Sequence, residues 1–289
     1  MANYEFIKDY CHNESIRESF NELAMKIFEL DFRPWYERGY WNEQYVPYSF
    51  IDNGKVIANA SINKMTVVID GEKYSAIQIG TVMTDESYRS QGLSRKLMQH
   101  VMDEYEAQCD FMFLFANETV LDFYPKFGFT RIDESEFSLD LEKNPIEVRD
   151  TKLKQLTIEN DSALLEKFAQ NRFINSNMLD VENNANLLMF YFTIPFKEAI
   201  FYIEDLETIV LMEEEEGTLH IFDIIALDAP NMEAILASVV KVTTKKVICY
   251  FTMENMPAIT KPNDDDALFV FSKKPLLMGN FMFPLTGHC

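Results

Sequence analysis

The sequence predicts an α/β (α+β) fold, in which a mixed, mostly antiparallel sheet flanked by helices is followed by a second, degenerate module of the same kind. Two hairpin-turn signals, Asp52-Asn53-Gly54 and Asp70-Gly71, stand between β-branched and aromatic stretches. The order strand, helix, strand then occurs twice, over 81–117 and over 225–255. With 289 residues and 47% hydrophobic content, the chain is long enough for two cores.

The elements of the first half can be taken in order. Apolar residues at helical spacing predict a helix over 14–32, and an aromatic-rich loop follows up to Tyr45. Strands are expected over 45–84, separated by the two turns, and the apolar run DFMFLFA predicts a buried strand at 110–116. A short helix is expected in ETVLDFYPKFGF, ending near Pro125 and Gly128, and strand alternation resumes in FTRIDESEFSLDLE.

Lys143-Asn144-Pro145 is the expected boundary, which gives domains 1–145 and 146–289. The second half opens with a helix in DSALLEKFAQNRF and continues with strands in KEAIFYIED and ETIVLMEEEEGTLHIFDIIAL. We interpret EEEEG as a solvated hairpin tip and not as a metal site. A helix in NMEAILASVVKVT and a strand in KKVICYFTMEN complete the repeat, with DAPN in place of TDESYRSQGLS. The second copy therefore lacks the long loop of the first.

Charge and cysteine content narrow the function classes. The chain has 26 basic and 47 acidic residues, a net charge of −21, which argues against nucleic acid or an anionic membrane as partner and is compatible with a cationic substrate. Its 4 cysteines are far apart, which fits neither a zinc site nor a disulfide framework. The charged N-terminus is unlike a signal peptide, and no apolar run is long enough to span a membrane. We expect a cytoplasmic protein without a metal.

The stretch ESYRSQGLSRKLMQHVMDEY suggests an anion site where a loop turns into a helix. Free backbone N–H groups at Gly92, Leu93 and Ser94 meet the positive end of the helix dipole. Gly92 has no Cβ, so an oxygen atom can approach the backbone. Arg89 and Arg95 stand three residues on either side of Gly92 and could clamp a phosphate. Taken alone, R-x-x-G-x-S is a weak signal, and a plain helix cap would explain it.

The context of this loop makes the signal specific. RSQGLS follows an apolar strand, and NETVLDFYPKFGF comes some two dozen residues later. Together they resemble the Gcn5-related N-acetyltransferase (GNAT) family, whose loop has the form [QR]-x-x-G-x-[GA] and whose second motif has the form N-x-x-A-x-x-F/L-Y-x-K-x-G-F. Val120 and Ser94 depart slightly from that pattern. The resemblance covers about 15–142 and is strongest over 79–130.

The resemblance implies a GNAT-type sheet, an acetyl-CoA cosubstrate and roles for particular residues. Gly92, Leu93 and Ser94 would cradle the pyrophosphate, with the rest of the loop beside them: Arg89, Ser90, Gln91 and Arg95. The backbone of Val82, Met83 and Thr84 would pair with the thioester carbonyl and the pantetheine, which Asn117 would contact from the opposite strand. Tyr124 occupies the family's general-acid position and would protonate the departing thiolate.

The general base is harder to assign, because the strand before the loop contains no glutamate. Candidates are Glu29, Asp31, Glu37, a water chain, or the C-terminal carboxylate of Cys289. The last follows from a resemblance to the enhanced intracellular survival branch, whose tandem modules acetylate amines and in which the chain terminus enters the active site. That branch usually has a third domain, for which this chain is too short. The plainer alternative for the ending GNFMFPLTGHC is a final strand that packs on its own domain.

Trp35, Tyr36 and Tyr40 lie where the family places the wall of its acceptor site, although a core or lid role is an equal alternative. The leading interpretation is an N-acetyltransferase acting on a primary amine, either a small cationic amine or a peptide amine. The main alternative is a non-catalytic CoA-binding sensor or scaffold whose second half binds a partner, and a third is a structural protein without a ligand. A homo-oligomer is compatible with the sequence, which carries no readable signal for it.

Overall fold

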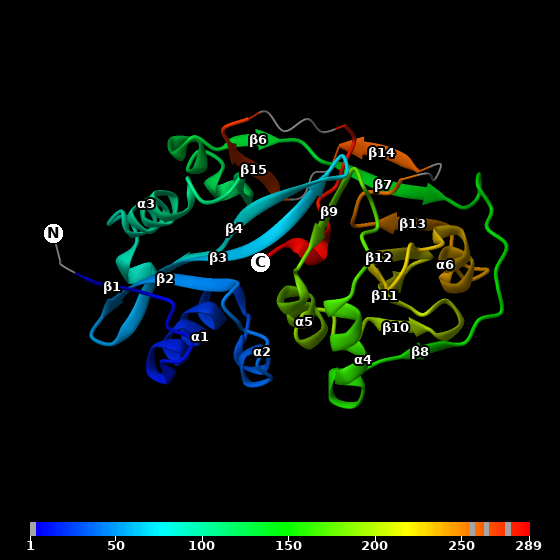
Figure 1. The fold of residues 1–289 in the computed structure, drawn as a ribbon, viewed down its shortest axis with the longest axis horizontal. Coiled ribbons are helices and arrows are strands. Elements are labelled where there is room, and N and C mark those ends of the chain that lie inside the picture. Colours follow the sequence, from blue (N-terminus) through cyan, green and yellow to red (C-terminus); the bar gives the residue numbers. More distant parts are fainter. Residues whose placement is uncertain (1–3, 255–257, 263–265, 275–278) are drawn as a thin grey trace.

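In the computed structural model, which describes residues 4–254, 258–262, 266–274 and 279–289, two sheets lie side by side (Figure 1). The first has the order β1-β2-β3-β4-β5-β15-β6, with β9 paired to β3, and the second has the order β14-β7-β13-β12-β11-β10-β8. The strands of the first sheet are β1 (Glu5–Lys8), β2 (Tyr45–Asp52), β3 (Lys55–Ile69), β4 (Glu72–Thr84), β5 (Phe111–Ala116), β6 (Thr130–Ile132), β9 (Leu179–Glu182) and β15 (Ala267–Ser272). Those of the second are β7 (Ser135–Asp140), β8 (Leu153–Gln155), β10 (Ile200–Ile203), β11 (Thr208–Glu215), β12 (Thr218–Ala226), β13 (Lys246–Cys249) and β14 (Ile259–Pro262).

Helices bury both faces of each sheet. In the first, α1 (Glu14–Phe28) and α2 (Arg33–Glu37) pack on one face around Phe20, while α3 (Leu93–Tyr105) packs on the other around Leu97. In the second, α4 (Ile158–Gln170) and α5 (Ala185–Thr193) cover one face, and α6 (Met232–Val239) covers the other. Short 3-10 turns complete the described elements: η1 (Glu86–Tyr88), η2 (Glu118–Val120), η3 (Tyr124–Phe127), η4 (Glu204–Leu206) and η5 (Leu285–Gly287).

The expected hairpins are confirmed. Asn53 and Gly54 both have positive φ, 49° and 76°, as do Asp70 and Gly71 with 50° and 77°. Two consecutive positive values are the signature of the tight turn whose twist matches that of paired antiparallel strands. The EEEEG tip closes β11 onto β12 in the same way, with Glu216 and Gly217 at 49° and 80°.

The strand β4 changes its pairing halfway along its length, and this change makes room for a site. It runs parallel to β5 only from Ala76 to Gln78, which pairs with Phe113. Further along, the register with β3 shifts at a bulge, where Thr81 has a φ of 47°. A bulge bends its strand and increases the local twist. The second half of β4 therefore leaves β5, and the two strands diverge toward α3.

The two sheets exchange strands across the middle of the chain. From the first half, β7 pairs with β13 and β14 in the second sheet, and from the second half, β15 lies between β5 and β6 in the first. The division at residue 145 stays a prediction about folding units, since sheet membership crosses it in both directions.

Several local expectations need correction. The aromatic loop contains α2, which begins at Arg33 with a proline in its first turn. The helix expected in 118–129 is instead two 3-10 turns, the second ended by Gly128 at a φ of 88°. The chain end is not a strand: described residues 279–289 are extended chain and η5. The sequence patterns gave no sign of β1, β9 or α5, and Asn255, at the end of the last expected strand, lies outside the described residues.

Candidate active site

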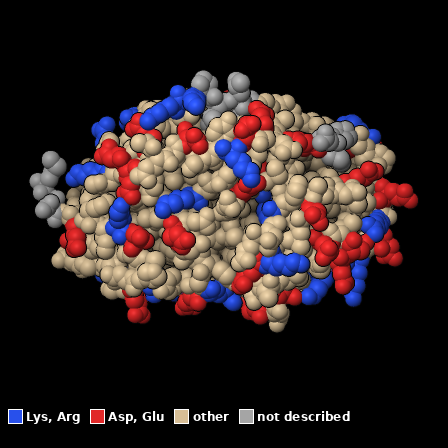
Figure 2. Space-filling view, viewed as in Figure 1, with Lys and Arg blue, Asp and Glu red and all other residues tan. Residues whose placement is uncertain are grey.

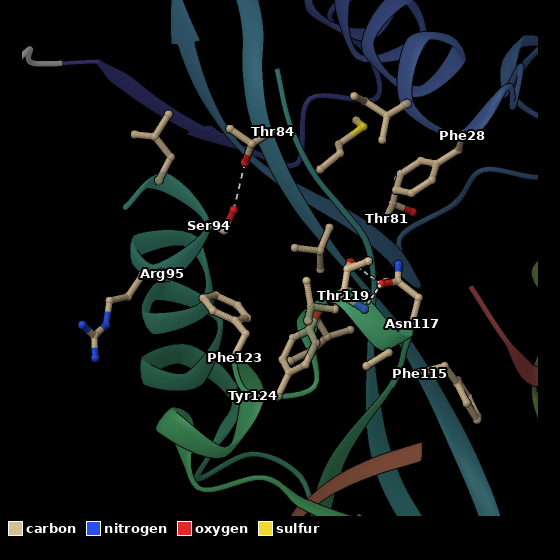
Figure 3. A pocket seen from close by; sticks show the side chains of 18 of the residues that line it. Phe28, Thr81, Thr84, Ser94, Arg95, Phe115, Asn117, Thr119, Phe123 and Tyr124 are labelled. Atoms are coloured by element: carbon tan, nitrogen blue, oxygen red, sulfur yellow. Dashed lines mark hydrogen bonds between the residues drawn. The ribbon is translucent and has the colours of Figure 1, made fainter. Parts of the chain in front are cut away.

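One cavity of about 700 Å³ lies where β4 and β5 diverge, at the start of α3 (Figure 3). Of the residues predicted to bind the cofactor, all except Gln91 line it: Val82, Met83, Thr84, Arg89, Ser90, Gly92, Leu93, Ser94, Arg95 and Asn117. The two residues predicted to be catalytic, Tyr124 and Cys289, line it too. Gln91 is exposed and accepts a hydrogen bond from the Tyr4 hydroxyl at 2.9 Å.

The helix α3 begins without a side-chain cap. Its N-cap residue is Gly92, in the left-handed region at a φ of 75°, where a residue with a Cβ is strained. No atom of the described residues lies within 4 Å of the place a Cβ would take, so they leave space for a ligand atom. Beside it, the hydroxyls of Ser94 and Thr84 are 2.9 Å apart and tie the helix start to β4. This end of α3 thus has the donors and the dipole that an anion needs.

The two arginines differ in how they lie. Arg89 is exposed, donates from Nε to the Thr84 carbonyl at 3.4 Å and stands 3.8 Å from Glu86. Arg95, one turn into α3, points away from the other labelled side chains in Figure 3. Both side chains are exposed and can move, whereas the backbone donors are fixed by the fold. The fixed part of the anion site is therefore the helix terminus.

The opposite wall consists of β4 and the loop after β5. Met83 buries its side chain in the core, so only its main chain can serve a ligand there, as predicted for Val82 and Thr84. Among the described residues, none pairs with β4 on its β5 side beyond Gln78. Asn117 caps η2, and its Oδ1 accepts from the Thr119 amide at 3.0 Å and from the Thr119 hydroxyl at 2.6 Å. Within the described residues, no hydrogen bond uses the Asn117 amide nitrogen.

Tyr124 comes from η3, between these walls (Figure 3). Its ring packs against Phe123, Phe129 and Phe269, with ring centroids 5.1, 6.4 and 5.9 Å away. Burial raises the pKa of Tyr124 to about 12, because the phenolate would be poorly solvated. In the described part of the chain its hydroxyl has no hydrogen-bond partner. Tyr124 is thus a protonated donor at neutral pH, in contact with the cavity.

The end of the chain reaches the same cavity, near the centre of Figure 1. Cys289 packs so closely on the bulged part of β4 that a Cβ on Gly80 would clash with a main-chain oxygen of Cys289. His288 stacks on Phe115 at 3.5 Å, and its carbonyl accepts from the Tyr191 hydroxyl at 2.9 Å. Burial lowers the pKa of His288 from 6.5 to about 3, so the ring is neutral at physiological pH. The other candidate bases, Glu29, Asp31 and Glu37, line neither this cavity nor the one next to it.

A buried polar network holds this tail, residues 279–289, in place, and no sequence motif predicted the network. Thr286 donates to Asp223 on β12, and Asp223 also accepts from Arg172 at 3.2 Å. Arg172 pairs in addition with Asp180 on β9 at 2.9 Å, and all three charged side chains are at most 3% exposed. Three residues before Thr286 in the tail, the Phe283 amide donates to Glu134 at 2.7 Å. Residues of the second half of the chain, together with Glu134 of the first half, therefore fix the position of the last residues.

The three predicted acceptor-wall aromatics separate in the structure. Trp35 is buried and lines a second cavity, of about 270 Å³, that adjoins the first. Tyr36 instead stacks on the guanidinium of Arg17 at 3.5 Å. Tyr40 donates to Glu166 on α4 at 2.8 Å, and burial together with that carboxylate raises its pKa to about 12. Tyr36 and Tyr40 are not among the residues that line either cavity.

Two further observations concern the whole described chain. No group of three or more His, Cys, Asp or Glu side chains in the described ranges is arranged to hold a metal ion. Within the same ranges, every helix is too short or too polar to cross a membrane. On the face seen in Figure 2, lysine and arginine side chains stand singly or in small groups among acidic ones.

Comparisons with known proteins agree with this geometry. Residues 13–132 match a family model described as an acetyltransferase (GNAT) domain. A probable N-acyltransferase from Enterococcus faecalis is 16% identical, with a TM-score of 0.63 over 94% of this chain and 72% of that one. Eis1 from Mycobacterium abscessus is 13% identical, with a TM-score of 0.60 over 92% and 73%. A GCN5-related N-acetyltransferase from Kribbella flavida is 15% identical, with a TM-score of 0.59 over 93% and 72%.

At such low identities, these structures establish the fold across both sheets and nothing finer. A search of curated proteins found no match. The family model covers the segment from α1 to β6, which contains the phosphate loop, the diverging strands and Tyr124. Residues 13–132 of this chain therefore resemble a GNAT acetyltransferase domain, and the chain as a whole shares the two-sheet fold of the structures named above.

Proposed function

We propose that this protein transfers the acetyl group of acetyl-CoA to a primary amine, with Tyr124 as general acid. The observation that carries the proposal is one cavity into which the uncapped start of α3, the free edge of β4, Asn117 and Tyr124 all open. Pyrophosphate fits the N–H groups at Gly92–Ser94, and the pantetheine arm fits the unpaired edge at Val82–Thr84. Such a fixed arrangement supplies catalysis chiefly by positioning the thioester and the amine.

The transfer needs one bond made, one bond broken and one proton moved. The amine nitrogen attacks the thioester carbon, and the N–C bond replaces the C–S bond. Main-chain N–H groups on the free edge of β4 stabilise the charge that develops on the carbonyl oxygen. Tyr124 donates its proton to the departing sulfur and regains one from the ammonium group of the forming amide. A phenol with a pKa of about 12 stays protonated at pH 7 and is ready for this step.

The attacking amine must first be neutral, and we propose the main-chain carboxyl group of Cys289 as its proton acceptor. Cys289 lines both cavities and packs against Gly80 at the β4 bulge, next to the free edge. His288 is a poor candidate, because its lowered pKa makes the ring a weak base. One test is a variant with two glycines added after Cys289. We expect kcat to fall while acetyl-CoA still binds, and an unchanged kcat would reject this role.

The test of the proposed function is CoA release from acetyl-CoA over a panel of primary amines, compared between wild type and Tyr124→Phe. Loss of the general acid should lower kcat by about 10²–10⁴-fold. Because the Tyr124 hydroxyl has no hydrogen-bond partner in the described structure, the variant should fold normally. Tyr202→Phe is the matched control, since that ring packs on Phe168 and does not line the cavity, and the kcat of this variant should be unchanged.

The same experiment separates the enzyme from a sensor. If acetyl-CoA binds and no amine in the panel is acetylated, the alternative of a non-catalytic CoA-binding protein gains support. If turnover is seen and Tyr124→Phe keeps it, the chain is an acetyltransferase with a different proton donor.

A further inference from the structure

The second cavity opens onto the first and has contributions from both halves of the chain. Four residues line both cavities: Phe28, Thr81, His288 and Cys289. Most of the rest of its wall is apolar and comes from the segment around α2 and from α5 and the residues after it, with Leu30, Phe32, Trp35, Leu187, Phe190 and Pro195. Tyr45 of β2 and Tyr191 of α5 complete it. At about 270 Å³ it is at the lower end of the range for small-molecule sites, which begins at roughly 300 Å³. A ligand held there would be small.

The hydrogen-bonding atoms of its aromatic residues already have partners. Trp35 donates from Nε1 to the Asn186 carbonyl at 2.8 Å, and the Tyr45 hydroxyl is 2.8 Å from the Thr81 hydroxyl. The Tyr191 hydroxyl donates to the His288 carbonyl at 2.9 Å. The rings therefore offer carbon surface to a ligand. A body rich in hydroxyl groups would lose its hydrogen bonds to water there without replacement.

The lack of charged side chains in this cavity also restricts which ligands it can bind. Among the described residues, no Asp, Glu, Lys or Arg side chain lines it, and His288 is neutral. The polar groups gather at the junction with the first cavity, where the main-chain oxygen of Cys289 lies against Gly80. One ammonium group can find hydrogen-bond acceptors at this junction, but a second ammonium group deeper in the cavity would be buried without a partner.

We infer that the acceptor is a primary monoamine with an aromatic or branched alkyl body, and this inference rests on the proposed function. The body occupies the cavity between α2 and α5, and the amine lies at the junction beside Thr81 and Cys289, facing the thioester. Acceptor specificity thereby depends on α5 of the second module as well as on the GNAT domain. Polyamines and sugar-based polycations are poor acceptors, despite the net charge of −21.

The test compares kcat/KM for 2-phenylethylamine and isopentylamine with that for ethylamine and spermidine. The apolar amines should exceed ethylamine by at least about 10-fold, since each methylene placed in an apolar pocket contributes about that factor. Leu30 is half-buried and lines only the second cavity, so Leu30→Asp places a carboxylate in it. That variant should lose about 10-fold or more with 2-phenylethylamine and gain with spermidine. Leu164→Asp, at a half-buried leucine of α4 outside both cavities, is the matched control.

A binding measurement separates failure of this inference from failure of the proposed function. The chain has 2 tryptophans: Trp35 lines the cavity, and Trp41 stacks on the Trp35 ring with the ring centroids 5.6 Å apart. Intrinsic tryptophan fluorescence therefore reports whether a ligand occupies the cavity. If 2-phenylethylamine changes the fluorescence, Leu30→Asp abolishes the change and no amine is acetylated, the cavity assignment holds and the proposed function fails. If acetylation is seen but spermidine or ethylamine is preferred, the inference is overturned while the function stands. Absence of both binding and turnover with the apolar amines also overturns it.

Discussion

The two modules contain the same strand–helix–strand unit, and the difference between them lies at the start of the helix. In the first, α3 follows the loop 85–92, and its N-cap residue is Gly92, which provides no side-chain cap. In the second, α6 follows a short turn, and its N-cap residue is Asn231, whose side chain accepts from the Ala234 amide at 3.1 Å. Both units have a parallel strand pair, β4 with β5 and β12 with β13.

The charged residues around the two helix starts also differ. The hollow beside α6 is lined by Asp205, Glu207 and Asp228, whereas Arg89 and Arg95 line the cavity at α3. In the second unit, the Asn231 side chain thus accepts a hydrogen bond from a free N–H group at the helix start. The carboxylates around this helix start repel phosphate. An anion site depends on a helix terminus that the protein itself leaves unsatisfied. What the second module contributes instead is the tail that it holds in the first cavity.

The largest effect is expected from the network that holds this tail. Asp223→Asn removes one partner of the buried Arg172 and weakens the bond to Thr286. The free energy of unfolding should fall by about 3–5 kcal/mol, as for other buried pairs that lose one charge. Urea denaturation measures this loss of stability. The control is Asp205→Asn, which breaks the exposed pair with Arg149 and should lower the free energy of unfolding by about 1 kcal/mol or less. Equal losses in the two variants would show that the network is not structural.

Next in size is the effect of Gly92→Glu on acetyl-CoA binding. The new side chain adds a carboxylate at the phosphate site and strains a left-handed residue. We expect Kd to rise more than about 100-fold, which corresponds to roughly 2.7 kcal/mol. Calorimetry measures this, with Gly71→Glu as the control for strain alone, since Gly71 is also left-handed, at a φ of 77°, and no described atom crowds a Cβ there. Equal binding by both variants would mean that α3 does not hold the phosphates.

A pH dependence should follow from His288, which is buried against Phe115. Its pKa is about 3 in the folded chain and about 6.5 when unfolded, so the unfolded state binds more protons between these values. Stability should therefore be lost as pH falls below 6.5, by at most about 1.4 kcal/mol per pH unit from this residue. The difference in unfolding free energy between wild type and His288→Asn, followed from pH 7 to pH 5, measures it. A difference that does not change with pH would contradict a neutral, buried ring.

The smallest effect is expected at the cap of α6. Asn231→Ala should lower the free energy of unfolding by about 1 kcal/mol, as for other N-caps, and leave acetyl-CoA binding unchanged. Thermal unfolding and calorimetry on the same sample measure both. A loss of acetyl-CoA binding would show that the second helix start takes part in ligand binding after all.

The sequence predicted what depends on local pattern. The turns at Asn53-Gly54 and Asp70-Gly71 and the loop before α3 need particular residues at adjacent positions, so short motifs reveal them. The exchange of β7 and β15 could not be read in this way. Ala116 pairs with Ala267, 151 positions further along the chain, and an apolar run does not encode which strand it joins.

The same limit applies to the site. Residues of the phosphate loop and Tyr124 were identified by their motifs, but the walls of the second cavity come from α2 and α5, which are far apart in the sequence. Trp35, Tyr36 and Tyr40 are equally aromatic, and only the packing decides that Trp35 lines the cavity while Tyr40 bonds to Glu166. The buried Arg172 pairs with Asp180 and Asp223, which lie 8 and 51 positions further along the chain, and no spacing of charges marks such pairs as buried.

The most direct measurement of the central claim is calorimetric titration of the wild-type chain with acetyl-CoA. The difference between the two helix starts predicts one binding site per chain, because α3 leaves its terminus open and α6 closes its own. A stoichiometry of one would support the assignment of the cavity at α3. Two sites per chain, or no binding at millimolar acetyl-CoA, would contradict it.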